Sequence, residues 1–274
     1  MISSRRSQAS DDNELLTQGA LLQNGSRPSL KDCLLSAAQK PPHMGGIFLL
    51  LGGTDVTHFH LRVAQSSVRG DFMPSYWSHC GILIPDRESF KLYDVPLDPP
   101  DGFHNMPMTN GVRERDPFPL DDPIRFPNLA LLWFPIRPHD SGSVIETLEM
   151  AIKRVKNERG ILDLTALILP WLRYVWGSGD GTNPLVAGNG IPAAAFIEAV
   201  CAVSGLELTP GLATKASCPE AIWQAAKWWH AYYQNVTPPA KKGPKGKQKK
   251  AAAGASQPVG MYWLGQPSAS IVVK

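Results

Sequence analysis

A histidine stands inside an otherwise apolar stretch of the chain, Tyr76–Ile84. Imidazole is the usual general base of enzymes because its pKa lies near neutrality. A lone histidine in such a run, here His79, is more often a core residue with a satisfied hydrogen bond. Asp94 lies in the next strand-like run, where a carboxylate could orient the imidazole. Taken alone, a carboxylate at the end of a strand would be expected to accept a hydrogen bond within a turn. The pair indicates a base with an orienting acid only if both side chains share one face of a sheet.

The four cysteines do not supply an obvious nucleophile. They stand at unrelated spacings, so neither a disulfide framework nor a metal site is predicted, and we expect free thiols. Cys80 follows His79 in a strand, so the two side chains should point to opposite faces. Cys201 falls on the apolar stripe of a helix and is expected in the core. Cys218 precedes a proline in a loop and is an unsupported alternative; Cys33 lies near the N-terminus.

Several short segments around these residues occur in a characteristic order. They are Gly45–Leu50, Trp77–Ile82 with the letters W-S-H-C-G-I, Lys91–Val95, Gly111–Arg113, Pro192–Ile197 and Ser217–Trp223. The series resembles the circularly permuted papain-like amidases and peptidases of the NlpC-type superfamily, which includes the lecithin retinol acyltransferase group. The chain departs from that pattern at Gly46, where the family usually has aspartate.

The resemblance implies an α+β fold, a permuted papain-like domain in which a small antiparallel sheet or partial barrel packs against helices. It assigns His79 as the general base and Asp94 as the residue that orients it. The family's nucleophilic cysteine falls at Ala193, at the start of a helix. A helix N-terminus and an adjacent imidazolium lower the pKa of a thiol, and the first N–H groups can stabilise an oxyanion.

Ala193 has two explanations. Either a cysteine hydrolase carries alanine in place of its nucleophile, or the chain is a natural relative that lost catalysis and kept a binding cleft. The retained His79 and Asp94 favour the first, because a chain that drifts after losing catalysis often loses its base as well.

By resemblance, the expected activity is that of a cysteine amidase or peptidase that forms an acyl-thioenzyme, with no cofactor and no metal. The expected substrate is a peptide, peptidoglycan or an acyl compound. Some relatives are antibacterial toxins delivered by type VI secretion, which would add an immunity protein or the secretion apparatus as a partner. The alternatives are a non-catalytic binding module and a lipid acyltransferase or phospholipase.

The elements that must position these residues follow from the apolar pattern. Strands are predicted at 47–51, 77–84, 90–95 and 129–135, and helices at 30–38, 141–157, 162–176, 192–204 and 219–233. Pro192 suits the first position of its helix because it lacks an N–H. If Ile84 and Phe90 close a hairpin, His79 opposes Val95. A shift of one residue or a bulge is then needed to bring Asp94 onto the face of His79.

Composition divides the chain into one folded domain and flanking segments. We expect a mobile N-terminal segment at 1–40, the papain-like domain at 41–236, a flexible Lys/Pro/Gly-rich loop or linker at 237–258, and a strand-like segment at 259–274 that returns to the domain. With 274 residues, 43% hydrophobic and only 19% charged, the chain can bury a sizeable core.

The charge distribution excludes some classes of partner. The net charge is +3, but the surplus lies in one lysine-rich stretch, so nucleic-acid binding is not expected. No apolar run approaches the roughly 20 residues that cross a bilayer, and the N-terminus lacks the core of a secretory signal. The protein is therefore expected to be made in the cytoplasm without a signal peptide, and the resemblance adds secretion by a signal-independent route.

Overall fold

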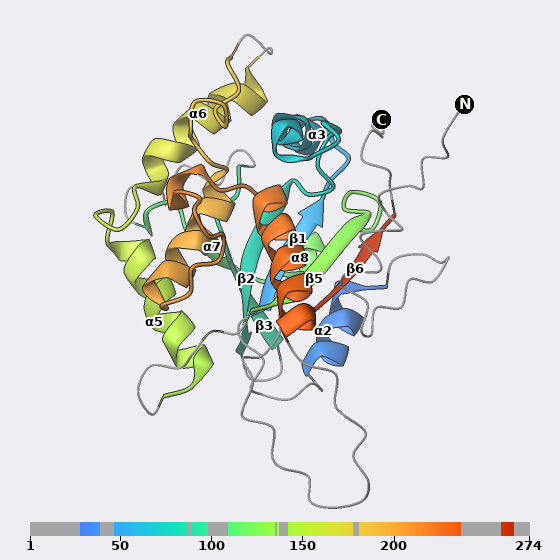
Figure 1. Ribbon diagram of the computed structural model, residues 1–274, viewed down its shortest axis with the longest axis vertical. Helices are drawn as coiled ribbons and strands as arrows, with labels where there is room; N and C mark the ends of the chain where they lie inside the picture. The colour runs from blue at the N-terminus through green and yellow to red at the C-terminus, as the bar shows by residue number, and fades with distance from the viewer. Residues whose placement is uncertain are drawn as a thin grey trace, which may run out of the picture.

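The structure is a computed structural model that describes residues 28–38, 47–86, 89–97, 109–134, 136, 142–177, 181–236 and 259–265. Its helices are α2 (Leu30–Ala38), α3 (Val56–Ala64), α5 (Val144–Asn157), α6 (Leu164–Trp176), α7 (Pro192–Val203) and α8 (Pro219–Val236). Its strands are β1 (Ile47–Gly52), β2 (His79–Asp86), β3 (Ser89–Asp94), β4 (Arg113–Arg115), β5 (Asn128–Trp133) and β6 (Val259–Leu264). Short 3-10 turns lie at Ser66–Val68, Phe118–Leu120 and Thr214–Ala216. The fold is α+β, as expected (Figure 1).

The strands form one sheet in the order β4-β3-β2-β1-β5-β6, with every neighbouring pair antiparallel. The four predicted strands are therefore confirmed as β1, β2, β3 and β5. The segment expected to return to the domain does so over 259–264, because β6 pairs with β5. Residues 266–274, the rest of that predicted segment, lie outside the described residues.

The hairpin between β2 and β3 differs from the simple pairing of Ile84 with Phe90. Pro85 pairs with Phe90 and Asp86 with Ser89, so β2 continues past Ile84 and the register is shifted by one residue. Proline is tolerated there because β1 pairs with β2 only as far as Leu83, which leaves this part of β2 with one neighbouring strand. The shift pairs Asp94 with Gly81 and brings Asp94 onto the face of His79.

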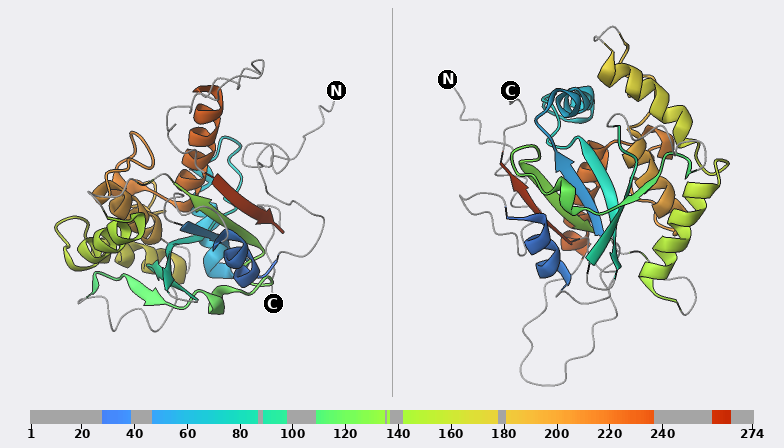
Figure 2. Two further views of the ribbon diagram at one scale, coloured as in Figure 1. Left: turned by 90° about the horizontal axis from the view of Figure 1, so that it is seen from below. Right: turned by 180° about the vertical axis from the view of Figure 1, so that it is seen from behind.

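Helices cover both faces of the sheet. Figure 1 and the view from behind in Figure 2 show α5, α6 and α7 gathered on one side and α2 on the other. The larger core lies between the sheet and α5 to α8, with α7 packed directly on β2. The smaller core includes Leu30 and Leu34 of α2. The folded part therefore includes α2, which lies inside the expected N-terminal segment 1–40; residues 1–27 and the lysine-rich segment 237–258 lie outside the described residues.

Local sequence signals explain where several helices begin. Ser143 caps α5 in a full capping box with Glu146, and Asp163 caps α6 by accepting a hydrogen bond from the Ala166 N–H. Pro192 occupies the start of α7 as predicted. α3 was not predicted, although Asp55 is its N-cap and accepts from the His58 N–H. Its sequence, VTHFHLRVA, contains several weak helix formers, so the cap and the packing on α6 decide its formation.

Candidate functional site

His79 and Asp94 are in direct contact. His79 is the first residue of β2, and its Nε2 lies 2.7 Å from Oδ2 of Asp94, the last residue of β3. Gly81 pairs with Asp94 on the same face. A Cβ at Gly81 would lie 2.6 Å from Leu92 Cδ1 and 3.1 Å from Asp94 Cβ, so the missing side chain leaves room for the side chain of Asp94.

The residues before His79 anchor the start of β2. Trp77 is fully buried, and its ring lies 5.0 Å from that of Trp223 on α8. The Ser78 hydroxyl accepts a hydrogen bond from the Gly53 N–H at 2.9 Å and donates one to the Leu51 carbonyl at 3.2 Å. The W-S-H sequence therefore joins the histidine to the core on one side and to β1 on the other.

Asp94 is fully buried and is paired with two groups. Besides His79, it accepts from Nε of Arg115 on β4 at 3.1 Å and from Nη2 of the same guanidinium. Burial alone would raise the pKa of Asp94, but the hydrogen bond to His79 and the charges of His79 and Arg115 outweigh it and hold that pKa below its usual value. The carboxylate is thus ionised, and it accepts the hydrogen on Nε2 of His79. Within the described residues, Nδ1 of His79 forms no hydrogen bond.

Ala193 lies in the first turn of α7 and is 1% exposed. The chain enters this helix along the 3-10 turn near Ser217: the Gly190 N–H donates to the Lys215 carbonyl at 2.7 Å, and the Ile191 N–H to the Ser217 carbonyl at 2.8 Å. A Cβ at Gly190 would lie 2.3 Å from the Ser217 carbonyl oxygen, so glycine permits this close approach of two backbones. The approach fixes the start of α7.

His79 and Ala193 meet at a small internal cavity of about 10 Å³, roughly the space of one water molecule. Its other lining residues come from α3 and from the loops around the sheet end: Thr57, His58, Leu61, Ser78, Val95, Leu97 and Ile191. The structure thus brings together all three residues singled out in the sequence. His79 is itself only 7% exposed, so the site is closed in this conformation.

No protein-family model matches the chain, and no curated protein matches it. The resemblance to the papain-like amidases therefore depends on the short sequence motifs alone. Among the described residues there is no helix with the length and apolarity to cross a membrane. The same residues contain no group of three or more His, Cys, Asp or Glu side chains arranged to hold a metal ion.

The cysteines do not form part of the wall of this cavity. All four are free and buried, and none lines it. Burial raises the pKa of Cys218 to about 12 and raises the pKa values of Cys80 and Cys201 well above the ordinary value. A protonated thiol is a poor nucleophile, so none of these three is chemically suited to the role expected at position 193.

Three residues near the site were not found from the sequence. Gly81 leaves room for the Asp94 side chain, Arg115 donates to the same Asp94 oxygen that contacts His79, and His58 of α3 lines the cavity with His79. The glycine follows His79 at a fixed spacing in W-S-H-C-G-I, and that signal was available. Arg115 and His58 were not signalled, because β4 has three residues and α3 was not predicted.

The ionised Asp94 is expected to stabilise the protein in a pH-dependent way. Its folded-state pKa lies below the ordinary value of 3.8. The unfolded chain therefore takes up a proton first as the pH falls. The stabilisation is fully present above that ordinary value and is lost as the pH falls through the folded-state pKa.

Urea unfolding of the protein and of Asp94→Asn, measured from pH 7 downward, checks this expectation. The difference in the free energy of unfolding should be constant near neutrality and shrink below about pH 4. Glu149→Gln, at an exposed position on α5, is the control and should give a small difference at every pH. A difference for Asp94→Asn that stays constant down to pH 2 would contradict the assignment.

Proposed function

We propose that the protein has the scaffold of a cysteine amidase or peptidase of the permuted papain-like kind. In this proposal His79 is the general base, Asp94 orients it, and position 193 is the place of the nucleophile. The observation that carries the proposal is that His79, bonded to Asp94 through Nε2, lines the same cavity as the residue at the start of α7.

The chemistry follows from which atoms remain available. Asp94 occupies Nε2 of the imidazole, which leaves Nδ1 to take a proton from a thiol at position 193. The thiolate would attack the carbonyl carbon, and N–H groups at the helix start would stabilise the oxyanion. His79 would then give its proton to the leaving amine, and water would release the acyl group. Alanine has no lone pair to attack with, so the protein with Ala193 does not form an acyl-thioenzyme.

Reaction of an Ala193→Cys variant with iodoacetamide at pH 5.5 tests the proposal. An ordinary thiol is almost fully protonated there, whereas a thiolate paired with imidazolium is ionised but intrinsically less nucleophilic. Together, the two effects should make alkylation of the thiol at residue 193 about tenfold faster than that of an ordinary thiol. Mass spectrometry of the digested protein locates the label.

Two controls make the result specific. Ala202→Cys places an exposed thiol at the other end of α7 and should react as an ordinary thiol. The double variant with His79→Ala should lose the acceleration at residue 193. If Ala193→Cys reacts no faster than Ala202→Cys and does not depend on His79, the hydrolase proposal fails.

The substrate is proposed by resemblance to be an amide bond in a peptide, and peptidoglycan is the first to test. A role as a toxic effector, with an immunity protein or secretion apparatus as partner, is part of the same proposal. Incubation of Ala193→Cys with purified peptidoglycan, casein and phospholipid vesicles separates the amidase, protease and phospholipase activities. Release of new amino groups from peptidoglycan alone is the expected result.

A non-catalytic binding module that uses the same cleft is the second candidate, and Ala193 favours it because alanine supplies no nucleophile. Ala193 and His79 are buried, and the cavity between them holds about one water molecule, which leaves no room for a scissile bond in this conformation. A module of this kind would keep the His79–Asp94 contact for stability alone. Ordinary reactivity of the thiol in Ala193→Cys, together with a large destabilisation in Asp94→Asn, would support it.

A further inference from the structure

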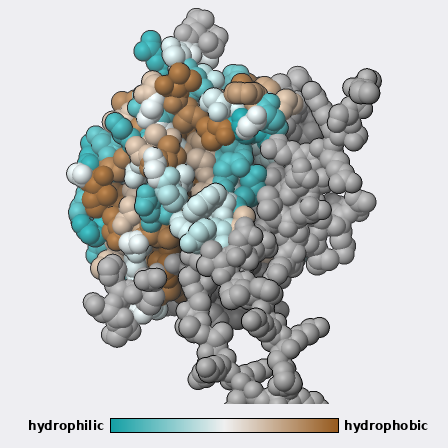
Figure 3. Space-filling model, viewed as in Figure 1, coloured by the Kyte–Doolittle hydropathy of each residue, from teal (hydrophilic) through white to brown (hydrophobic). Residues whose placement is uncertain are grey.

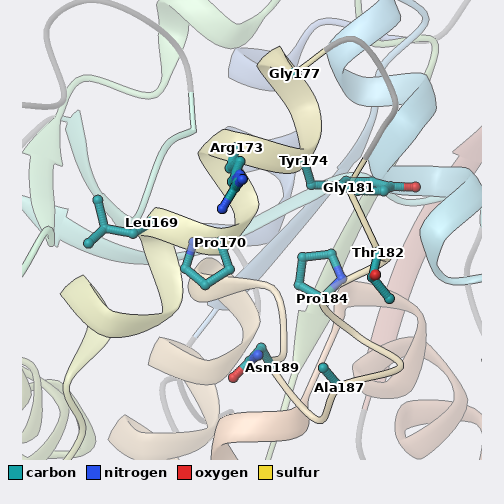
Figure 4. A pocket seen from close by; sticks show the side chains of 10 residues that line it. All are labelled: Leu169, Pro170, Arg173, Tyr174, Gly177, Gly181, Thr182, Pro184, Ala187 and Asn189. Atoms are coloured by element: carbon teal, nitrogen blue, oxygen red, sulfur yellow. The ribbon is translucent and has the colours of Figure 1, made fainter.

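A second, much larger pocket lies on the outer side of α6. Its volume is about 760 Å³, within the range of small-molecule sites, and it is formed by the second half of α6 and by the segment 181–189. Figure 4 shows Pro170 and Pro184 between Arg173 on one side and Asn189 on the other. None of these residues lines the cavity at His79.

Among the described residues that line the pocket, one side chain is charged at neutral pH, and it is positive. Arg173 is the only ionisable residue at neutral pH among the ten that line it, and no acidic residue is one of them. Within the described part of the chain, Arg173 forms no ion pair. Its guanidinium therefore offers a fork of N–H donors to an anion, with Asn189 as a further polar side chain in the wall.

The rest of the lining is mainly apolar. Leu169, Pro170 and Pro184 form much of it, and the ring of Tyr174 borders it. Leu169 is 56% exposed. Figure 3 shows hydrophobic side chains over α6 beside hydrophilic ones on this face. An apolar surface next to a single cation suits a ligand that has an apolar part and one anionic group.

The wall of the pocket is held in place by hydrogen bonds. Nε1 of Trp171 donates to the Gly190 carbonyl at 2.7 Å and to the Asn189 carbonyl at 3.1 Å, which ties α6 to the opposite wall. Asn183 donates to the Ala64 carbonyl on α3 at 2.8 Å. A pocket fixed in this way loses little conformational entropy when a ligand binds.

We infer that this pocket binds a small organic anion, with a carboxylate or phosphate on Arg173 and an apolar portion against Leu169, Pro170 and Pro184. The inference goes beyond the proposed function and does not depend on it, because the pocket contains none of the residues assigned to the hydrolase chemistry.

Isothermal titration calorimetry with three matched probes tests the inference on the full chain. N-acetyl-L-phenylalanine carries a carboxylate, phenyl phosphate carries a phosphate, and N-acetyl-L-phenylalaninamide is neutral. At least one anionic probe should show saturable binding, and its affinity should exceed that of the amide by about tenfold or more. Arg173→Gln should weaken binding of that probe by about tenfold. Lys153→Gln, which removes one exposed charge from α5, should leave the affinity unchanged.

A second variant tests the place of binding. Ala187 lines the pocket and is exposed, so Ala187→Phe fills part of the pocket without disturbing the core. Ala187→Phe should weaken binding of the anion as well. Binding of only one of the two anions identifies the carboxylate or the phosphate as the group recognised. Equal binding of the amide, equal loss in Lys153→Gln, or no binding of either anion would each overturn the inference.

Discussion

Replacing Gly190 with alanine is expected to lower the free energy of unfolding by about 3 kcal/mol. The new Cβ would lie 2.3 Å from the Ser217 carbonyl oxygen, 2.6 Å from the Ser217 nitrogen and 2.7 Å from the Ala216 carbonyl carbon. These are backbone atoms, so no side-chain rotation can relieve the overlap. The two segments must separate, and separation breaks the hydrogen bonds from Gly190 to Lys215 and from Ile191 to Ser217.

Urea unfolding measures this change, and Gly160→Ala is the matched control. A Cβ at Gly160 would have no atom within 4 Å, so the same substitution there should cost little or be slightly stabilising, because it restricts the unfolded chain. The start of α7 follows Gly190 directly. In the Ala193→Cys background, Gly190→Ala is therefore also expected to abolish the rapid reaction of the thiol. Equal stability of the two glycine variants would show that the close backbone approach is not required.

Replacing Gly81 with valine is expected to cost a similar amount, about 3 kcal/mol. Valine is favoured in strands, so backbone propensity would predict the opposite sign. The cost comes from space: the Cβ alone would lie 2.6 Å from Leu92 Cδ1, 2.9 Å from the Tyr93 carbonyl oxygen and 3.1 Å from Asp94 Cβ. The two further methyl groups of valine would push Asp94 away from His79.

The control for Gly81→Val is Ser89→Val, which introduces the same side chain at an exposed position of β3. It should leave the free energy of unfolding nearly unchanged. The NMR chemical shifts of the His79 imidazole give a second readout, because they report whether the ring still contacts Asp94. Unchanged imidazole chemical shifts together with unchanged stability in Gly81→Val would contradict the role given to this glycine.

The sequence predicted most elements of the fold because their apolar patterns are strong. β1 and β5 are continuous apolar runs that are fully buried, and α5 has both a clear apolar stripe and a capping box. α3 and β4 were missed for a physical reason. Neither sequence has a helix or strand propensity strong enough to distinguish it from a loop. α3 depends on its Asp55 cap and on packing, and β4 on three backbone pairs with β3.

The candidate site was found by motif, and its geometry was only partly accessible. His79, Asp94 and Ala193 were selected from the sequence, and the structure places them around one contact and one cavity. The sequence alone could not determine the register between β2 and β3. A hairpin that ends at Asp86 requires Pro85 to lie inside a strand, whereas one that ends at Ile84 does not, and the apolar pattern does not distinguish them. Side-chain partners from elements distant in sequence, such as Arg115, depend on that register.

The position of β6 in the sheet has a consequence for how the chain acquires its structure. β6 pairs with β5, and the pairing joins Trp133 to Val259 across a long stretch of intervening chain. Closing so large a loop is entropically costly, so this pairing is expected late in folding. During synthesis β5 emerges well before residues 259–264, and until they arrive its outer backbone groups can pair with a strand of another molecule. The period of greatest risk of self-association therefore ends only when β6 docks.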